Sequence, residues 1–453
     1  MDYKEALDFL EEIKKVGSKP GLTAIGQLLE ELGSPQEGMA FVHVAGTNAK
    51  GSVSAYIASI LACAGYVTGR FSSPAVFVYE EMIQVLTGEP ESSLDKAAAG
   101  ESLAHSPIHI SPIEKEELAS CIEVIKAACI KMAEEGKEHP TAFEVETAMA
   151  FLYFRRKNCD IVVLEVGMGG RLDATNIIEA PKCSVLTSIS MDHWEYLGNT
   201  LKEIAWHKAG IIKPGIPVVS YKQEEEAEKV IKEVAEERKA VLTTADFSDI
   251  TIHKMDMDET LFDYGAFKNL KIKLLGKHQV YNAATAITAA EALNNNGIPI
   301  DRKDIYRGLQ CTEWEGRFQR INSNPLIIID GAHNEGAAGV LAENIRIYLK
   351  NKTLYFVMGM FKDKDYEAVL RLTAEYAEEI YCITPPGPRG LPSSQLAEAA
   401  ARQGVKAVNA VNVKQALSGI KEKAGEAGEY AILAFGSLSI LKEVKEEVNC
   451  LYQ

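Results

Sequence analysis

Short apolar runs alternate with longer segments of helical period along most of the chain. In the first half, the apolar runs predict strands at residues 41–44, 67–71, 82–85, 160–165, 183–188 and 217–220. Apolar residues at helical spacing predict two helices within residues 3–32 and further helices at 52–65, 114–135, 142–155, 201–209 and 224–238. A run such as 160–165, apolar between charged ends, is typical of a parallel strand buried on both faces. The alternation therefore predicts an α/β fold.

The pattern changes in the second half of the chain. Residues 242–275 have the shorter period of small β segments, and a helix at 279–293 ends in an Asn/Gly/Pro cluster at 294–299. Strands predicted at 326–329, 354–357, 380–383 and 430–434 then alternate with helices. Because such clusters favour turns, we expect a linker here. The predicted domains are residues 1–297 and a smaller, doubly wound domain at residues 298–453.

Composition and charge narrow the class of protein. The 453 residues are 47% hydrophobic and 25% charged, as in globular proteins. A net charge of −16 argues against a nucleic-acid partner. The eight cysteines form no C-x-x-C pair, and no apolar run approaches the roughly 20 residues of a membrane span. We expect a cytoplasmic, monomeric protein with reduced thiols and no membrane partner.

A glycine- and lysine-containing loop follows the first predicted strand. It comprises Gly46, Thr47, Asn48, Ala49, Lys50, Gly51 and Ser52, and a helical pattern follows it. Such a loop wraps backbone N–H groups around a phosphate at a helix N-terminus, with a lysine for the outer phosphates and a hydroxyl for Mg²⁺. The spacing departs from the standard P-loop, because only three residues separate Gly46 from Lys50. The alternative is an ordinary strand-to-helix turn with a solvated lysine.

The amino-acid sequences of this loop and of a second segment resemble those of one protein family. The sequence His-Val-Ala-Gly-Thr-Asn-x-Lys-Gly-Ser from residue 43 is similar to the ATP loop of the folylpolyglutamate synthase and dihydrofolate synthase family. This family is the folate branch of the Mur-type ATP-dependent amide ligases. The decamer at residues 167–176, which contains Gly-Gly-Arg-Leu-Asp-Ala-Thr-Asn, also resembles the family. The resemblance implies a P-loop-like Mur-ligase ATPase domain followed by a Rossmann-like ligase domain.

The resemblance also implies roles for individual residues. It places ATP on residues 46–52 and on Asn282, Arg317 and Asp330, with His333 near the reacting centre, so that the nucleotide lies between the domains. It implies Mg²⁺, two ions, bound by Ser52, Ser73, Glu144, His193 and a carbamylated Lys208. Four of these ligands have a plainer alternative: a turn before proline for Ser73, an acid that complements the helix dipole for Glu144, a structural histidine for His193, and a surface helix lysine for Lys208.

Four positions depart from the family pattern. Ala49 replaces a glycine, Ala75 a histidine, His207 a glutamate and Glu315 a proline. Glycine is the usual residue where φ is positive or a phosphate approaches the backbone. Because Gly46, Lys50 and Gly51 are all present, we expect a loop that has adapted to alanine with an ordinary negative φ at position 49.

The function implied by the resemblance is ATP-dependent amide formation. The substrates would be L-glutamate and a pterin acid, which is dihydropteroate, a folylglutamate or either of them. They would be joined through an acyl phosphate, with Lys50, Lys208 and His333 as catalytic residues. Two alternatives remain open. One is a related Mur-type ligase for another acid and amino acid; the other is a weakly active relative that binds nucleotide or folate.

Overall fold

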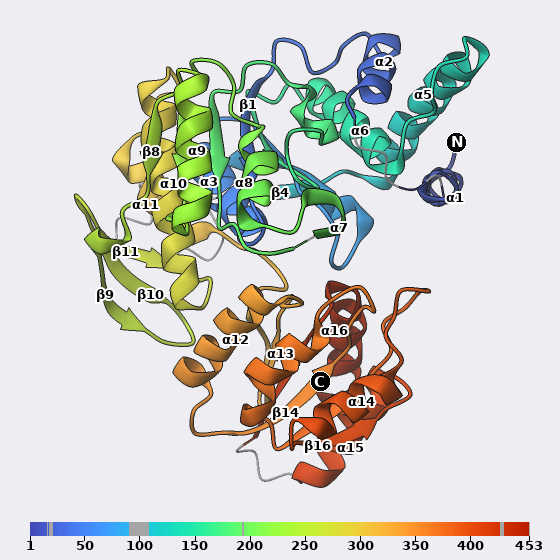
Figure 1. The fold of residues 1–453 in the computed structure, drawn as a ribbon, viewed down its shortest axis with the longest axis vertical. Coiled ribbons are helices and arrows are strands. Elements are labelled where there is room, and N and C mark those ends of the chain that lie inside the picture. Colours follow the sequence, from blue (N-terminus) through green and yellow to red (C-terminus); the bar gives the residue numbers. More distant parts are fainter. Residues whose placement is uncertain (16, 18–20, 90–107, 193, 426–429, 453) are drawn as a thin grey trace. The chain divides into compact units, whose positions relative to one another are not determined.

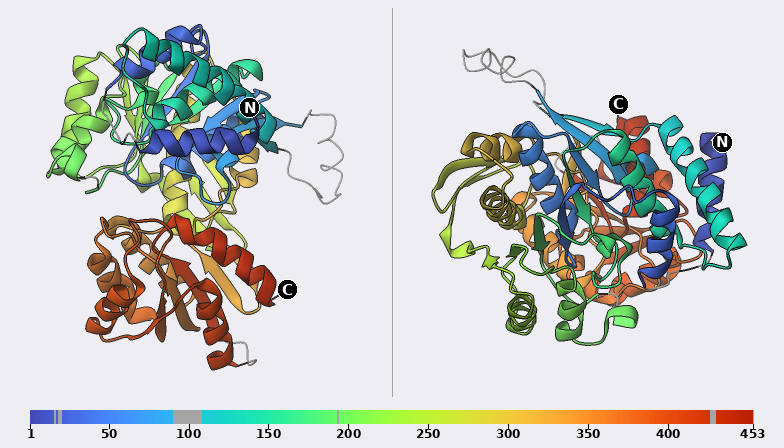
Figure 2. Two further views of the ribbon diagram at one scale, coloured as in Figure 1. Left: turned by 90° about the vertical axis from the view of Figure 1, so that its right-hand side faces the viewer. Right: turned by 90° about the horizontal axis from the view of Figure 1, so that it is seen from above.

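A computed structural model describes residues 1–15, 17, 21–89, 108–192, 194–425 and 430–452 (Figures 1 and 2). The chain forms two compact units that interleave in sequence. The first comprises Met1–Thr251, Phe262–Ile272 and Tyr281–Thr312, and the second comprises Ile252–Leu261, Lys273–Val280 and Glu313–Gln453.

The expected linker does not separate these units. Residues 294–299 join α10 (Lys277–Asn295) to α11 (Arg302–Cys311) within the first unit, and the last crossing falls after Thr312. A domain that folds independently and ends at residue 297 stays a prediction.

An eight-stranded mixed sheet forms the centre of the first unit. Its order is β4-β3-β2-β5-β1-β6-β7-β8, and all neighbours from β2 to β8 are parallel. The strands are β1 (Ala40–Ala45), β2 (Thr68–Phe71), β3 (Ile83–Gly88), β4 (Ile108–Pro112), β5 (Ile161–Glu165), β6 (Cys183–Leu186), β7 (Val218–Ser220) and β8 (Leu242–Thr244). The antiparallel strand β4 is not among the strands predicted from the sequence, and residues 90–107 lie outside the described ranges.

Helices cover the sheet in two groups (Figure 1). The first unit contains α1 (Tyr3–Lys14), α2 (Thr23–Glu31), α3 (Lys50–Cys63), α5 (Lys115–Glu134), α6 (Ala142–Arg156), α7 (Trp194–Leu197), α8 (Leu201–Ala209), α9 (Glu225–Glu237), α11 and, from Tyr281 onward, α10. A core of α1, α2, α5 and α6 packs on the face that presents Val162 and Leu164 of β5. Ile161 and Val163 alternate with them and so face the opposite side, where α3 contacts the sheet and α11 packs on α3.

The helix after the glycine-containing loop is buried all round. Every residue of α3 from Gly51 to Ala62 is buried, so this part of the helix has no solvent-exposed face. A helix of this kind belongs to the interior of a domain, not to its surface. Its N-terminus, and with it Lys50, is therefore held in place by packing along the whole helix.

The second unit contains a six-stranded sheet in the order β12-β13-β17-β14-β15-β16. Its strands are β12 (Gln319–Ser323), β13 (Leu326–Ile329), β14 (Thr353–Met358), β15 (Glu379–Cys382), β16 (Lys406–Asn409) and β17 (Tyr430–Phe435), and its helices are α12 (Glu335–Tyr348), α13 (Tyr366–Thr373), α14 (Ser393–Arg402), α15 (Val413–Ala424) and α16 (Leu438–Tyr452). Only the pairing of β12 with β13 is antiparallel. A smaller sheet has the order β11 (Phe267–Ile272), β10 (Thr260–Tyr264) and β9 (Ile250–Met255).

Two sequence expectations concern the whole chain. All eight cysteines are free thiols, in line with the absence of a C-x-x-C pair. Within the described ranges, no helix combines the length and apolar character that a membrane crossing requires.

Candidate functional site

The glycine- and lysine-containing loop leaves the C-terminal end of β1, between its parallel neighbours β5 and β6. Ligands of α/β sheets bind at this end of the strands. Ala49 is the residue before α3, with φ 68° and ψ −5°, which is the left-handed (αL) conformation. The expected negative φ is therefore wrong. The loop keeps the backbone that a glycine would adopt, at a cost of about 1–2 kcal/mol for an L-residue.

A segment after β6 holds the loop by hydrogen bonds. The backbone N–H groups of Thr47 and Asn48 donate to the carbonyl of Ser188 at 2.8 and 3.2 Å. The Thr47 hydroxyl donates to the carbonyl of Ser190 at 3.0 Å and accepts from the Ser190 N–H at 3.1 Å. Asn48 Nδ2 donates to Ser190 Oγ at 3.1 Å. No motif in the sequence indicated these serines.

Two lysines converge on the carbonyl of Gly46. Lys50 Nζ donates to Gly46 O and to Thr47 O, both at 3.2 Å. Lys208 Nζ, from α8, donates to Gly46 O at 2.8 Å. Lys208 is only 3% exposed, which rules out the surface-lysine alternative. Burial, and then the Lys50 ammonium, lower the pKa of Lys208 to about 7.

The decamer at residues 167–176 forms a compact turn beside this loop. Buried Asp173 accepts hydrogen bonds from Met168 N at 2.8 Å and from Thr175 Oγ1 at 2.6 Å, and burial raises its pKa. Because the Thr175 hydroxyl has one hydrogen, which it gives to Asp173, it accepts from His43 Nε2 at 2.9 Å. Burial lowers the pKa of His43 to about 3. His43 is thus a neutral link from β1 to this turn.

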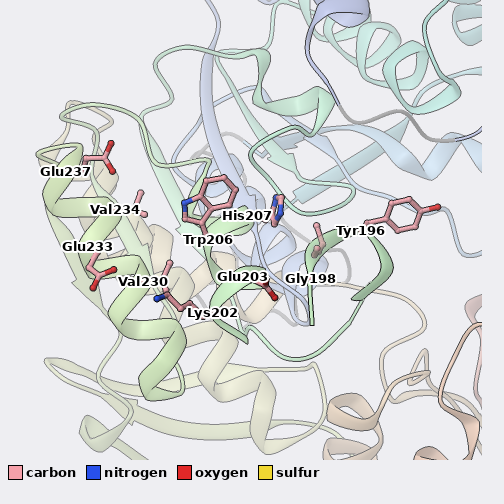
Figure 3. A pocket seen from close by; sticks show the side chains of 11 residues that line it. Tyr196, Gly198, Lys202, Glu203, Trp206, His207, Val230, Glu233, Val234 and Glu237 are labelled. Carbon is pink, nitrogen blue, oxygen red and sulfur yellow. The ribbon is translucent and has the colours of Figure 1, made fainter. Parts of the chain in front are cut away.

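Arg171 of the decamer contacts Trp206, which lines a pocket in the first unit (Figure 3). Its guanidinium lies over the Trp206 ring, 3.8 Å from the centroid, a cation–π contact. The pocket, about 520 Å³ in volume, lies between α7, α8 and α9. Its lining includes Tyr196, Lys202, Trp206, His207, Glu233 and Glu237. The departure at His207 therefore lies on the outer side of α8, whereas the adjacent Lys208 faces the loop.

The predicted metal ligands have different surroundings. Glu144 Oε2 accepts from Thr141 N and Oγ1 at 2.7 and 2.8 Å, and Oε1 accepts from Ile25 N at 3.1 Å. Ser52 is buried in the first turn of α3, and Ser73 lies between β2 and β3. His193 lies outside the described residues. Among the residues that are described, no group of three or more His, Cys, Asp or Glu side chains forms a metal cluster.

Asn282, Arg317, Asp330 and His333 are divided between the two units. Asn282 is buried in the α10 part of the first unit. In the second unit, Asp330 directly follows β13 and accepts from Phe318 N at 2.7 Å and Ala332 N at 2.8 Å. Burial raises its pKa, and the nearby Arg317 opposes this. His333 Nδ1 lies 2.8 Å from the carbonyl of Gly331, which can only accept, so Nδ1 carries the hydrogen.

The remaining two departures lie in ordinary surroundings. Glu315 forms an ion pair with Lys445 at 2.7 Å on the surface of the second unit. Ala75 packs partly buried against the core of α1, α2, α5 and α6. Neither contact involves the loop at residues 46–49.

Comparison with known proteins agrees with this architecture. The model of the Mur ligase middle domain matches residues 113–290, and that of the Mur ligase glutamate ligase domain matches residues 316–438. The chain is therefore a Mur-type ligase, and the predicted fold class is confirmed.

Individual relatives show to which branch of the Mur-type ligases the chain belongs. The dihydrofolate synthase/folylpolyglutamate synthase of Bacillus subtilis is 34% identical over 404 residues, 88% of each chain. The crystal structure of folylpolyglutamate synthase from Thermotoga maritima has a TM-score of 0.79 at 32% identity and covers 99% of this chain and 96% of its own. The Escherichia coli protein in complex with DHPP and ADP has a TM-score of 0.80 at 30% identity, covering 99% and 98%. The chain belongs to the folylpolyglutamate synthase/dihydrofolate synthase family of ATP-dependent ligases.

Proposed function

We propose that this chain uses ATP to join L-glutamate to a pterin-linked carboxylate, either dihydropteroate or a folylglutamate. The observation that carries the proposal is the position of Lys50, at the N-terminus of a fully buried helix and within 3.2 Å of two loop carbonyls. The family membership and the DHPP and ADP in the E. coli relative support the same substrates.

Residues 46–52 bind the phosphates of ATP in this proposal. Lys50 leaves the loop carbonyls for the γ-phosphate, and the N–H groups at the start of α3 face the anion, as helix N-termini do. Asn282, Arg317 and Asp330 bind the rest of the nucleotide, with Arg317 on the phosphates and Asp330 on the ribose hydroxyls.

The chemistry takes two displacement steps. A substrate carboxylate oxygen attacks the γ-phosphorus, the bond to ADP breaks, and an acyl phosphate forms. The amine of L-glutamate then attacks the acyl carbon, phosphate leaves, and the nitrogen loses a proton to give the amide. Lys50 stabilises the charge on the transferred group, Arg317 acts on the same phosphates, and His333 lies near the reacting carbon.

The oxygen donors of the first unit fit Mg²⁺, two ions in this proposal. Ser52 and Ser73 offer hydroxyls, and Glu144 Oε1 accepts only one hydrogen bond and keeps a lone pair. Carbamylation of Lys208 would add a carboxylate, which suits a hard cation better than an ammonium, and His193 completes the set. Bound Mg²⁺ neutralises charge that develops on the phosphates.

Release of ADP tests the proposal. Purified protein is incubated with ATP, Mg²⁺ and a panel of pterin acids, each with and without L-glutamate or another amino acid. We expect ADP formation that requires both a pterin acid and L-glutamate. Lys50→Ala should abolish it, while Lys232→Ala, at an exposed lysine paired with Glu228, should not. Turnover with another acid and amino acid, or none with any pair, would reject the proposal.

A further inference from the structure

The shape of the loop at residues 46–49 depends on contacts that are distant in sequence. Thr47 and Ser190, for example, are 143 residues apart. A backbone conformation that L-residues rarely adopt persists only where the surrounding structure enforces it. Ala49 has such a conformation, with φ 68°, and so some contact must fix the peptide that precedes it.

Thr187 makes that contact. It follows β6 directly and is fully buried. Its hydroxyl lies 2.7 Å from Asn48 O and 3.3 Å from Ala45 O. Because a hydroxyl has one hydrogen, the shorter contact is the donated bond. The Asn48 carbonyl belongs to the peptide plane between residues 48 and 49, and the orientation of that plane helps to set φ of Ala49.

The same hydroxyl explains why residue 46 is a glycine. An added Cβ at position 46 would overlap the Thr187 hydroxyl, so no side chain fits there. Gly46 is needed by the packing of Thr187 as well as by any phosphate that approaches the loop. One buried side chain therefore constrains both ends of the loop, at residue 46 and at the entry to residue 49.

We infer that Thr187 is a positioning residue for nucleotide binding, a role that its hydroxyl performs through Asn48 and Ala49. Ala49 directly precedes Lys50, so its φ directs the start of α3 and the lysine. The inference rests on the proposed role of residues 46–52 as a phosphate site. Thr187 itself contacts no substrate in this assignment.

Paired substitutions at position 187 test the inference. Thr187→Val keeps the shape of the side chain and removes the donor, whereas Thr187→Ser keeps the donor. We expect Thr187→Val to weaken ADP binding, measured by calorimetry, about tenfold, or ~1.4 kcal/mol, the size of one net hydrogen bond. The KM for ATP should rise to a similar extent, with the KM for pterin acid and for L-glutamate unchanged. Thr187→Ser should bind ADP as the wild type does.

Two further variants separate positioning from stability. Thr373→Val removes a 2.8 Å bond to Val369 O from an equally buried threonine of the second unit, so it should lower the melting temperature and leave ADP binding unchanged. Glycine adopts positive φ readily. In the Ala49→Gly background, the effect of Thr187→Val on ADP binding should therefore be much smaller than in the wild type.

The outcomes are distinct from those of the proposed function. Wild-type ADP affinity in Thr187→Val would overturn the inference. An equal rise of all three KM values, failure of Thr187→Ser to restore binding, or an undiminished effect in the Ala49→Gly background would also overturn it. The proposed function fails instead if the wild type binds ADP but releases none from ATP with pterin acid and L-glutamate.

Discussion

Lys208 on α8 donates a hydrogen bond to the carbonyl of Gly46 at 2.8 Å, so α8 is joined directly to the loop before α3. Lys50 donates to the same oxygen at 3.2 Å. Two ammonium groups thus share one acceptor, and the buried one loses its proton more readily than a lysine in water.

The first prediction concerns carbamylation of Lys208. Only a neutral amine adds CO₂, and with a pKa of about 7 much of Lys208 is neutral at slightly alkaline pH. Protein equilibrated with carbon-13-labelled bicarbonate should show a carbamate signal that Lys208→Met lacks. Removal of CO₂ should lower turnover reversibly.

Lys213 provides a matched control, because burial lowers its pKa as well and it donates to Asn176 O at 3.0 Å. Lys213→Met should retain the carbamate signal. If turnover is independent of bicarbonate and the wild type shows no carbamate signal, Lys208 is not carbamylated. Its role would then be to hold the loop as a cation through its bond to Gly46 O.

The second prediction is a loss of stability in acid that depends on His43. Burial lowers the pKa of folded His43 to about 3, whereas the ordinary value is 6.5. Between these values the unfolded chain binds a proton that the folded chain does not, so stability falls as the pH falls. One proton corresponds to about 1.4 kcal/mol per pH unit, which gives about 2 kcal/mol between pH 7 and pH 5.

Urea unfolding at the two pH values measures this effect. His43→Gln removes the titrating group and keeps an N–H that can reach Thr175. Its loss of stability between pH 7 and pH 5 should be about 2 kcal/mol smaller than that of the wild type. Equal losses in both proteins would show that other groups cause the acid sensitivity.

The sequence predicted those parts of the site that are contiguous. Residues 41–65 determine a strand, a loop and a helix locally, so Lys50 could be placed at a helix N-terminus from the pattern alone. Lys208 was assigned by resemblance, and its burial against Gly46 agrees with a role inside the fold. The edge strand β12 was missed, because its five residues are mostly polar and lack an apolar run.

Long-range contacts account for what the sequence did not predict. The αL conformation of Ala49 depends on Thr187, and the Glu144 carboxylate is bonded to Ile25, which is 119 residues away. Spacing within a motif carries no information about such partners. The expectation of a negative φ at position 49 was wrong because it considered alanine without the residues that enforce its conformation.

The third prediction concerns Asp330. Asp330→Ala leaves the N–H groups of Phe318 and Ala332 without this acceptor. Since each unmet buried donor costs about 1–3 kcal/mol, the second unit should lose about 2–6 kcal/mol of stability in urea unfolding. ATP should also bind more weakly if Asp330 holds the ribose.

An ATP analogue without ribose hydroxyls separates the two effects. The wild type should bind the analogue more weakly than ATP. The variant should bind both equally, because the contact is already lost. If Asp330→Ala still prefers ATP by the wild-type factor, Asp330 has only a structural role.

The last prediction concerns Ala49→Gly. Glycine removes the αL cost of about 1–2 kcal/mol, but it loses about 0.5–1 kcal/mol through the greater freedom of the unfolded chain. The net effect on stability should lie between zero and a gain of about 1.5 kcal/mol. If ATP binding requires a positive φ at residue 49, relief of the αL strain raises the fraction of loops that have this conformation. ATP affinity, measured by calorimetry, should therefore rise severalfold.

Ala55→Gly is the matched control, because Ala55 is fully buried in the interior of α3. Glycine there gains no relief of strain, so the same substitution should cost about 1 kcal/mol in stability. Opposite signs at positions 49 and 55 would attribute the gain to the positive φ of Ala49. A loss of stability in both variants would mean that the surrounding contacts already offset the strain at Ala49. In that case alanine at position 49 does not weaken nucleotide binding.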